Sequence, residues 1–352
     1  MSERNDLATF RIPYWYEWNP WEPNVQVAMN DLAKPGETVF DVGANAGALS
    51  LVLSRAVGPK GTVCSFEASP RIVGKCQYNL VQNGVNNVTL YHYAVYSKSK
   101  QVMKIYPGDH LNDSVVVQGN HPENAVNVET ITLDDFSSRY DLSPSLIKMD
   151  IEGAEYEALL GGERVLNDNR PHLLLEQQPD DTRCMEFLMQ RGYRAIDLCN
   201  LTEIKSRADF ETGVGIANVL YIHSSRLAGT GYEPPIRREV VAELSANDFT
   251  KVGVDFFSKP VTLAPGRYYF DNEFEAERRH NEAFFGLESA GTQLFRYHTY
   301  TQFHASSYRD WVVDLKTETA VTIFSRFMNG TSDPTLKWNG SVIYRIPSLS
   351  QS

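Results

Sequence analysis

The feature that most constrains the fold of this chain is an alternation of short apolar runs with stretches of helical spacing between residues 37 and 222. β-Branched apolar runs predict buried strands, and apolar residues that recur every three to four positions predict helices. Strands that alternate with helices are typical of an α/β domain whose parallel sheet is covered on both faces. We therefore predict a doubly wound, Rossmann-like sheet.

In such a sheet, ligands bind beyond the carboxyl ends of the strands, so functional residues are expected in the turns that follow them. The expected strands are TVFDV (38–42), TVCSFE (62–67), NVTLYHYAV (87–95), QVMKIY (101–106), NVETIT (127–132), SLIKMD (145–150), HLLLE (172–176) and ANVLYI (217–222). The expected helices are 24–33, ALSLVLSRA (48–56), 70–81, AEYEALLGG (154–162) and DTRCMEFLMQRG (181–192).

We place this α/β domain at residues 24–223. The pattern of apolar and turn residues changes after it. Residues 224–235 are rich in Gly, Ser and Pro and are expected to form a linker. Residues 236–352 contain short runs of period-two character separated by turn residues, which predicts a small all-β domain, a sandwich or a jelly roll. Its tryptophans, Trp311 and Trp338, are expected in its core. As an alternative, they could bind a glycan or form a contact between subunits.

The N-terminal segment 1–23 is predicted to be a separate aromatic element, because three prolines in 10–23 disfavour a regular helix. We expect its aromatic side chains to be buried against the sheet domain or a partner subunit. As an alternative, the segment could form a lid or a sugar-stacking wall, in which case Glu22 could reach the cofactor pocket. The aromatic residues concerned are Tyr14, Trp15, Tyr16, Trp18 and Trp21.

Composition and charge narrow the classes of partner. The net charge is −11, which repels phosphate backbones and makes nucleic acid an unfavourable partner; a small molecule or carbohydrate fits better. No apolar run is long enough to span a bilayer, and no signal peptide is visible, so a cytoplasmic protein is expected. The four cysteines are widely spaced, which indicates neither a zinc site nor a redox dithiol.

The strongest local motif is VFDVGANAG (39–47), in which Asp41 lies near the end of the first strand. Gly43 permits a tight turn, Asn45 tolerates left-handed backbone angles, and Gly47 leads into a helix whose N-terminus can bind a carboxylate or phosphate. Glu67 ends the second strand, where a carboxylate can accept hydrogen bonds from both hydroxyls of a ribose. The pattern predicts a nucleotide-like cofactor.

A second motif is IKMDIEGAE (147–155), in which Asp150 closes a strand at the edge where ligands bind. Glu152 follows it and is expected at the same site. Glu155 lies at the start of the next helix, where its charge would complement the helix dipole, and a structural role is at least as plausible for it.

Taken together, the motifs DVGANAG (41–47), FEASP (66–70), ITLDDF (131–136) and IKMDIEGAE (147–155) resemble the FkbM family of S-adenosylmethionine-dependent methyltransferases, over roughly residues 20–222. The resemblance implies a class I methyltransferase fold and O-methylation of hydroxyls, often of sugars or natural products. It also implies that Asp41, Gly43, Asn45 and Gly47 line the methionine end of the cofactor. Glu67 would hold the ribose, and Asp150 would face the reacting centre.

Methyl transfer to a hydroxyl requires alignment and a general base, for which Asp150, Glu152 and His110, in the loop-like stretch around LNDSVVVQGN (111–120), are the candidates. His121, Asp113 and Ser114 lie in the same stretch and could also contact ligands. A Mg²⁺ ion held by Asp150, Glu152 and Glu176 is a less favoured alternative.

Two other classes of function remain open from the sequence. An acidic residue after a second strand also suits an NAD-dependent oxidoreductase, although the glycine pattern differs from the dinucleotide fingerprint. The chain could also be a glycan-binding or assembly protein whose β-rich domain carries the function, and a homo-oligomer is possible.

Overall fold

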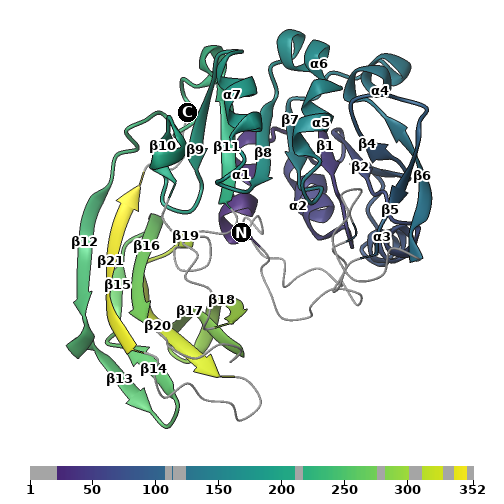
Figure 1. The fold of residues 1–352 in the computed structure, drawn as a ribbon. Helices are drawn as coiled ribbons and strands as arrows, with labels where there is room; N and C mark the ends of the chain where they lie inside the picture. Colours follow the sequence, from purple (N-terminus) through teal and green to yellow (C-terminus); the bar gives the residue numbers. More distant parts are fainter. Residues whose placement is uncertain are drawn as a thin grey trace.

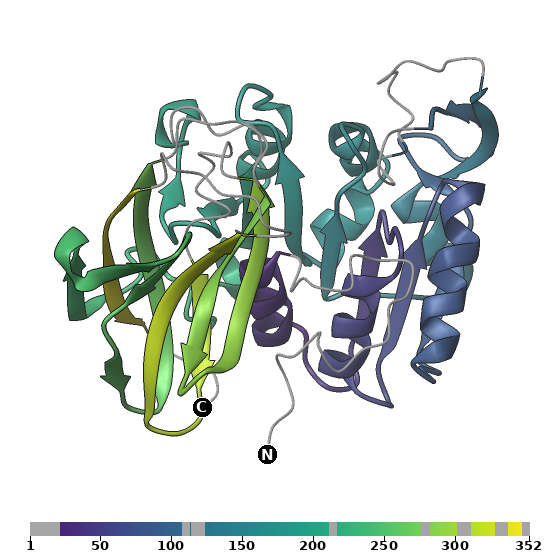
Figure 2. The ribbon, with the colours of Figure 1, turned by 90° about the horizontal axis from the view of Figure 1, so that it is seen from below.

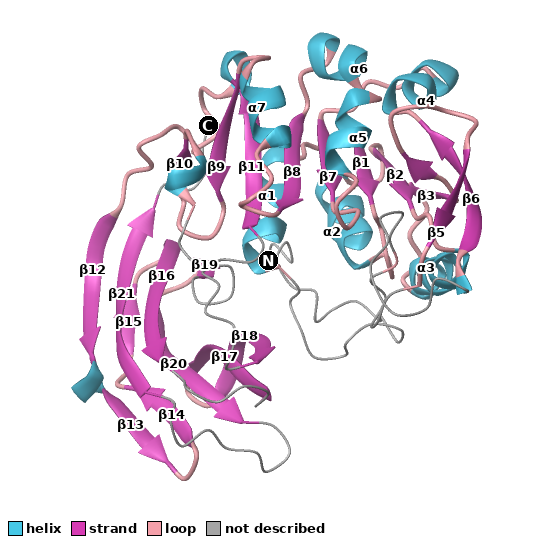
Figure 3. Cartoon of the chain, viewed as in Figure 1, coloured by secondary structure: helices cyan, strands magenta, loops and turns pink. Residues whose placement is uncertain are grey.

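A computed structural model describes residues 22–107, 113, 124–210, 217–275, 282–300, 311–327 and 337–346 (Figure 1). The expected aromatic segment 14–21 and the candidates His110, Ser114 and His121 lie outside these residues, so their roles stay predictions. The described chain forms an α/β part and an antiparallel β part, which lie side by side in Figure 2. Figure 3 shows that the helices gather around the first part.

The α/β part is built on one eight-stranded sheet, in which β1 is a central strand. In spatial order the strands are β10 (Glu203–Ile204), β9 (Tyr193–Asp197), β11 (Ala217–His223), β8 (His172–Gln177), β7 (Leu146–Met149), β1 (Thr38–Val42), β2 (Thr62–Phe66) and β3 (Val88–Tyr91). The five strands from β8 to β3 are parallel to one another, as predicted. The predicted doubly wound, Rossmann-like sheet is thus present.

The expectation of an all-parallel sheet is wrong at the other edge. β11 pairs antiparallel with both β8 and β9, and β10 pairs antiparallel with β9. A parallel neighbour needs a crossover, usually an α-helix. The described part of the connection from β9 to β11 holds only β10 and the 3₁₀ turn Arg207–Asp209, so the chain returns in the opposite direction.

Helices cover both faces of the sheet because alternate residues of its buried strands point to opposite sides. Val39 packs in one core with α1 and α2, whereas its neighbour Phe40 packs in the other with α4 to α7. The helices are α1 (Pro23–Leu32), α2 (Ala48–Val57), α3 (Pro70–Gln82), α4 (Leu133–Tyr140), α5 (Glu155–Leu160), α6 (Glu163–Asp168) and α7 (Arg183–Met189).

The strand expected at 87–95 is divided in two. β3 ends at Tyr91, and the following β4 (Ala94–Val95) leaves the main sheet to pair with β6 (Val126–Ile131). β6 also pairs with β5 (Val102–Ile105), which confirms the two strands expected here. This small sheet lines one side of the cavity described below.

The C-terminal part consists of two antiparallel sheets that pack face to face, which confirms the predicted all-β domain as a sandwich. One sheet has the order β12 (Glu239–Ser245), β21 (Lys337–Ile346), β16 (Gly266–Glu275), β19 (Trp311–Leu315). The other joins β13 (Phe249–Val252), β14 (Asp255–Ser258), β20 (Thr319–Phe327), β17 (Glu282–Ser289) and β18 (Thr292–Tyr300), with β15 (Val261–Leu263) also paired to β20. Trp338 is 4% exposed and lies in this core, as expected.

The sandwich packs directly against α1, which lies between the two parts in Figures 1 and 2. Val312 and Ile346 of the sandwich share a hydrophobic cluster with α1 and with the large sheet. Leu227 and Tyr232, from the stretch expected to be a linker, are buried in the same cluster. The domain boundaries at 224–235 stay a prediction, but the two parts share a continuous core.

Candidate active site

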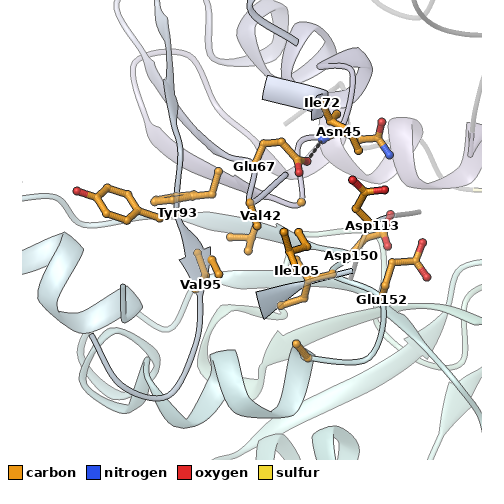
Figure 4. Close-up of a pocket in the computed structure, with 16 residues that line it drawn as sticks. Val42, Asn45, Glu67, Ile72, Tyr93, Val95, Ile105, Asp113, Asp150 and Glu152 are labelled. Atoms are coloured by element: carbon orange, nitrogen blue, oxygen red, sulfur yellow. Dashed lines mark hydrogen bonds between the residues drawn. The ribbon is translucent and has the colours of Figure 1, made fainter. Parts of the chain in front are cut away.

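A cavity opens at the carboxyl ends of β1, β2 and β7 (Figure 4). Its apolar wall comes from α3 and from the small sheet and includes Ile72, Tyr93, Val95 and Ile105. Carboxyl side chains line the remainder: Glu67, Asp113, Asp150 and Glu152. One end of the cavity therefore suits an apolar ring, and the other suits polar or cationic groups.

The turn after β1 forms the floor of this cavity and depends on Gly43. Gly43 has φ +81°, and a Cβ atom added there would lie 1.8 Å from the carbonyl oxygen of Asp150. The turn thus approaches the end of β7 more closely than any side chain allows. Asn45 also has a positive φ, +51°, and lines the cavity. Gly47, at the start of α2, is not among the lining residues and faces Cys76 instead.

Glu67 is held in place by the turn itself. One carboxylate oxygen accepts a hydrogen bond from the backbone N–H of Asn45 at 2.8 Å, and the other accepts one from Ser69 N–H at 2.7 Å. Burial raises the pKa of Glu67 to about 7, although both backbone hydrogen bonds oppose the shift. Each oxygen keeps a second lone pair, so the fixed carboxylate can accept two further hydrogen bonds from a ligand.

Asp41 does not line the cavity. It is fully buried, and its carboxylate accepts a 2.5 Å hydrogen bond from Ser50 Oγ on α2. Its other oxygen lies 4.0 Å from Nζ of Lys148. The expected cofactor residues therefore separate into Gly43, Asn45 and Glu67 at the cavity and Asp41 beneath it.

Lys148 is a buried cation that sequence reasoning missed. Its Nζ atom lies 3.3 Å from Oδ2 of Asp150 and 3.3 Å from the carbonyl oxygen of Gly43. Burial lowers its pKa, but the surrounding carboxylates, with Asp150 first, outweigh that effect and raise the pKa overall. A lysine inside the apolar strand LIKM is a signal that could have revealed it. Lys148 fixes the side chain of Asp150 at the rim of the cavity.

The loop after β7 places Glu152 between two cavities. Glu152 has φ +56° and lines the first cavity together with Asp150. It also lines a second cavity, which Glu176, Tyr156 and Arg183 help to form. Burial, and then the charge of Asp150, raise the pKa of Glu152 to about 7. Such a carboxyl group can exchange protons near neutral pH.

Two other acids of the motifs have structural partners instead. Glu155 accepts hydrogen bonds from the backbone N–H of Ile151 at 2.8 Å and of Gly153 at 3.4 Å, which fits the structural role weighed for it. Asp134 accepts bonds from the backbone N–H groups of Arg164 and Val165, both at 2.9 Å, at the start of α6. Both carboxylates thus accept hydrogen bonds from backbone N–H groups, Glu155 in the loop before α5 and Asp134 at the start of α6.

Asp113 lies at the cavity and is held by α3. Ser69 Oγ donates a 2.5 Å hydrogen bond to it, and the Arg71 guanidinium forms a salt bridge with it. Among the residues that the structure describes, no three acids, histidines or cysteines lie close enough together to hold a metal ion. The structure thus brings Asp150, Glu152 and Glu176 to one edge without forming such a cluster.

The order of the large sheet and the cavity at its carboxyl edge define a class I methyltransferase domain. Residues 41–195 match the family model of the methyltransferase FkbM domain. No helix of the described chain is both long and apolar enough to cross a membrane.

Several known proteins resemble this chain. The 2-O-methyltransferase NoeI of Sinorhizobium fredii is 28% identical over 156 residues, which is 40% of this chain and 63% of that relative. The tRNA (adenine(58)-N(1))-methyltransferase TrmI of Thermus thermophilus is 41% identical over 61 residues, or 17% of this chain and 24% of its own length. The chain thus spans less than two thirds of the length of either relative. A crystal structure of an FkbM methyltransferase from Methylobacillus flagellatus KT is 18% identical, covers 53% of this chain and 43% of its own, and has a TM-score of 0.36.

Proposed function

We propose that this protein is an S-adenosylmethionine-dependent methyltransferase that methylates a hydroxyl group of a carbohydrate or a similar neutral, polyhydroxylated acceptor. The observation that carries the proposal is the pair of cavities at the carboxyl edge of the sheet, which Glu152 joins. One cavity fits the cofactor, and the other leaves room for an acceptor. The match to the FkbM domain model and the similarity to a 2-O-methyltransferase support this assignment.

The residues of the first cavity fit S-adenosylmethionine. Ile72, Val95 and Ile105 offer apolar surface to the adenine. Glu67, with its carboxylate fixed by two backbone N–H groups, is placed to accept both ribose hydroxyls. Gly43 and Asp150 would face the methionine half. When bound, the cofactor supplies a methyl group that its sulfonium charge has already activated.

The charge of the second cavity restricts the acceptor. Glu152, Glu176 and Asp181 line it, and the cationic Arg183 is already paired with Asp181 at 2.6 Å. An anionic acceptor such as a phosphate or carboxylate would be repelled by this surplus of negative charge. Carboxylates and backbone groups are suitable acceptors for hydrogen bonds from neutral hydroxyls, so a sugar fits this cavity.

Glu152 is our candidate for the general base. It lies at the boundary of the two cavities, where the acceptor hydroxyl must lose its proton. Asp150, the other candidate in the described chain, is engaged by Lys148 at 3.3 Å and is better placed to position the cofactor. His110 remains a candidate outside the described residues.

The direct test of the function is ligand binding followed by turnover. S-adenosylhomocysteine should raise the melting temperature of the protein, and NAD should not. Stabilisation by NAD alone would favour the oxidoreductase alternative and overturn the proposal. A mass-spectrometric screen with labelled S-adenosylmethionine against neutral and anionic sugars then identifies the acceptor, and methylation confined to anionic sugars would contradict the charge argument.

The Glu67→Gln variant should bind S-adenosylmethionine about 10- to 100-fold more weakly, because charge-assisted hydrogen bonds contribute about 1.5–3 kcal/mol each. The amide also turns one N–H group toward a backbone N–H of Asn45 or Ser69, which disturbs the fixed geometry. Isothermal titration calorimetry measures the effect. Glu157→Gln is the matched control, since Glu157 accepts a hydrogen bond from Ser97 away from both cavities; equal affinities in the two variants would remove Glu67 from the ribose site.

The Glu152→Gln variant should lower kcat by about 10²- to 10⁴-fold while cofactor affinity is retained, as expected for loss of a general base. A base must be ionised to act. Because the pKa of Glu152 is about 7, kcat of the wild type should rise with pH up to about 7 and then level off. The variant should lose this rise. Asp150→Asn provides the comparison: if it alone abolishes turnover with intact cofactor binding, Asp150 and not Glu152 is the base.

A further inference from the structure

Glu22 is a buried carboxyl group that the proposed mechanism has not used. It immediately precedes α1, with φ +48°, and is 9% exposed. Its Oε1 atom accepts a hydrogen bond from Nδ2 of Asn218 at 3.1 Å. Among the residues that the structure describes, its Oε2 atom has no hydrogen-bond partner. A buried carboxylate oxygen without a partner is costly unless a ligand or a proton compensates for it.

The surroundings of Glu22 are the charged groups of the active site. Lys148 on β7 and Asp150, directly after that strand, interact with Glu22 electrostatically, and so does Asp41 on β1. Glu176 of β8, which is paired in register with Asn218 of β11, also faces this group. Within the described ranges, the cluster thus contains the four carboxyl groups of Glu22, Asp41, Asp150 and Glu176, but a single buried ammonium, that of Lys148.

Burial, and then the charge of Asp150, raise the pKa values of Glu22 and Glu176, so ionising the whole cluster requires more positive charge than Lys148 supplies. Asp150 belongs to this cluster and also lines the first cavity, so a cation bound in that cavity would supply it. The methionine half of S-adenosylmethionine carries an ammonium and a sulfonium against one carboxylate, so it is a net cation. We propose that Glu22 is a cofactor-binding residue whose carboxylate pairs with the cationic methionine half of S-adenosylmethionine. This inference rests on the proposed function of the first cavity.

The position of Glu22 is set by α1, and α1 is held from two sides. Asn24 donates a 3.0 Å hydrogen bond to the carbonyl oxygen of Leu198 in the α/β part and accepts one of 3.1 Å from the backbone N–H of Val312 in the sandwich. Near the other end of the helix, Asp31 is bound by Arg267 of the sandwich. The β-sandwich therefore holds the helix that carries Glu22 to the active site.

The test compares three ligands in the full chain by calorimetry at pH 7.5. S-adenosylmethionine carries both charges, S-adenosylhomocysteine keeps the ammonium, and 5′-methylthioadenosine lacks the amino-acid half. The Glu22→Gln variant should bind the first two about tenfold or more weakly and should bind 5′-methylthioadenosine like the wild type. Glu157→Gln should leave all three affinities unchanged.

Titration supplies a second measurement. Burial, and then the charge of Asp150, raise the pKa of Glu22 to about 7, whereas Lys148 and the bond from Asn218 oppose the shift. A bound cation favours the ionised form, so wild-type affinity should increase as pH rises from 5.5 to about 7 and proton release should accompany binding below pH 7. The variant should release up to one proton fewer.

The outcomes separate the inference from the function on which it rests. If the wild type binds none of the three ligands, the proposed function fails. If the wild type binds all three and Glu22→Gln affects them equally, or affects none, Glu22 is a structural residue and the inference is overturned. Selective loss of the two ligands with an amino-acid half, together with reduced proton release, supports it.

Discussion

The Gly43→Ala variant is expected to lose cofactor binding and to be destabilised by about 3 kcal/mol or more. The added methyl group would lie 1.8 Å from the carbonyl oxygen of Asp150, which belongs to the backbone and cannot rotate away. The ends of β1 and β7 would have to separate, and that movement displaces the backbone N–H of Asn45 from Glu67. Calorimetric melting and titration with S-adenosylhomocysteine measure the two losses.

Gly36→Ala is the matched control for this prediction. Gly36 has a similar φ of +88°, but no atom lies within 4 Å of the added Cβ. It should therefore show only the cost of a left-handed alanine, about 1–2 kcal/mol, with normal cofactor affinity. If Gly43→Ala is no more damaging than Gly36→Ala, the close approach of the two strand ends does not shape the site.

Local patterns in the sequence were sufficient to predict the elements that contribute most to the cavity. The apolar runs place β1, β2 and β7, and the turn glycine and the acid after the second strand follow from where such strands end. Both features are properties of short segments, so a single sequence shows them. The positive φ values of Gly43 and Asn45 confirm that the turn needs residues tolerant of left-handed angles.

Strand direction and the orientation of Asp41 could not be predicted in the same way. Apolar runs look alike in parallel and antiparallel strands, so β11 gave no local sign of its reversal. Asp41 lies one residue before the end of β1, and only the positions of Ser50 and Lys148 show that it faces the buried network under the cavity. These contacts join distant parts of the chain.

The charged cluster around Lys148 illustrates the same limit. Glu22, Lys148 and Glu176 are far apart in the sequence and become neighbours only when α1 packs on the sheet beside β7, β8 and β11. The packing of α1 in turn depends on its contacts with the sandwich, and no local sequence motif predicts these contacts. The tertiary arrangement, rather than any short pattern, determines which acids share the active site.

The contact between α1 and the sandwich leads to the last prediction. Arg267 is buried and binds two carboxylates: Asp31 of α1 through bonds of 2.6 and 2.8 Å, and Asp314 of β19 through bonds of 2.8 and 2.9 Å. Tyr232 also donates a 2.9 Å hydrogen bond to Asp31. Burial raises the pKa of Asp31, and the bonds from Arg267 lower it without cancelling the effect of burial. The site therefore strongly disfavours an unpaired negative charge.

The Arg267→Met variant should destabilise the protein by about 3–5 kcal/mol, because it fills similar space but leaves two buried carboxyl groups without their cation. Arg326→Met is the matched control, since Arg326 pairs with Glu288 at a half-exposed position and its loss should cost about 1 kcal/mol or less. Adding Asp31→Asn and Asp314→Asn to Arg267→Met should restore part of the stability. No restoration would mean that Arg267 acts through packing and not through its charge.

The same variant connects stability with function, if it is studied at a temperature where it remains folded. Loosening α1 from the sandwich should displace Glu22, so Arg267→Met should bind S-adenosylmethionine more weakly and 5′-methylthioadenosine with nearly unchanged affinity. Arg326→Met, within the same sandwich but away from α1, should bind both ligands normally. Unchanged affinity for S-adenosylmethionine in a folded Arg267→Met protein would show that α1 keeps its place without the sandwich, and that this buried ion pair contributes to stability alone.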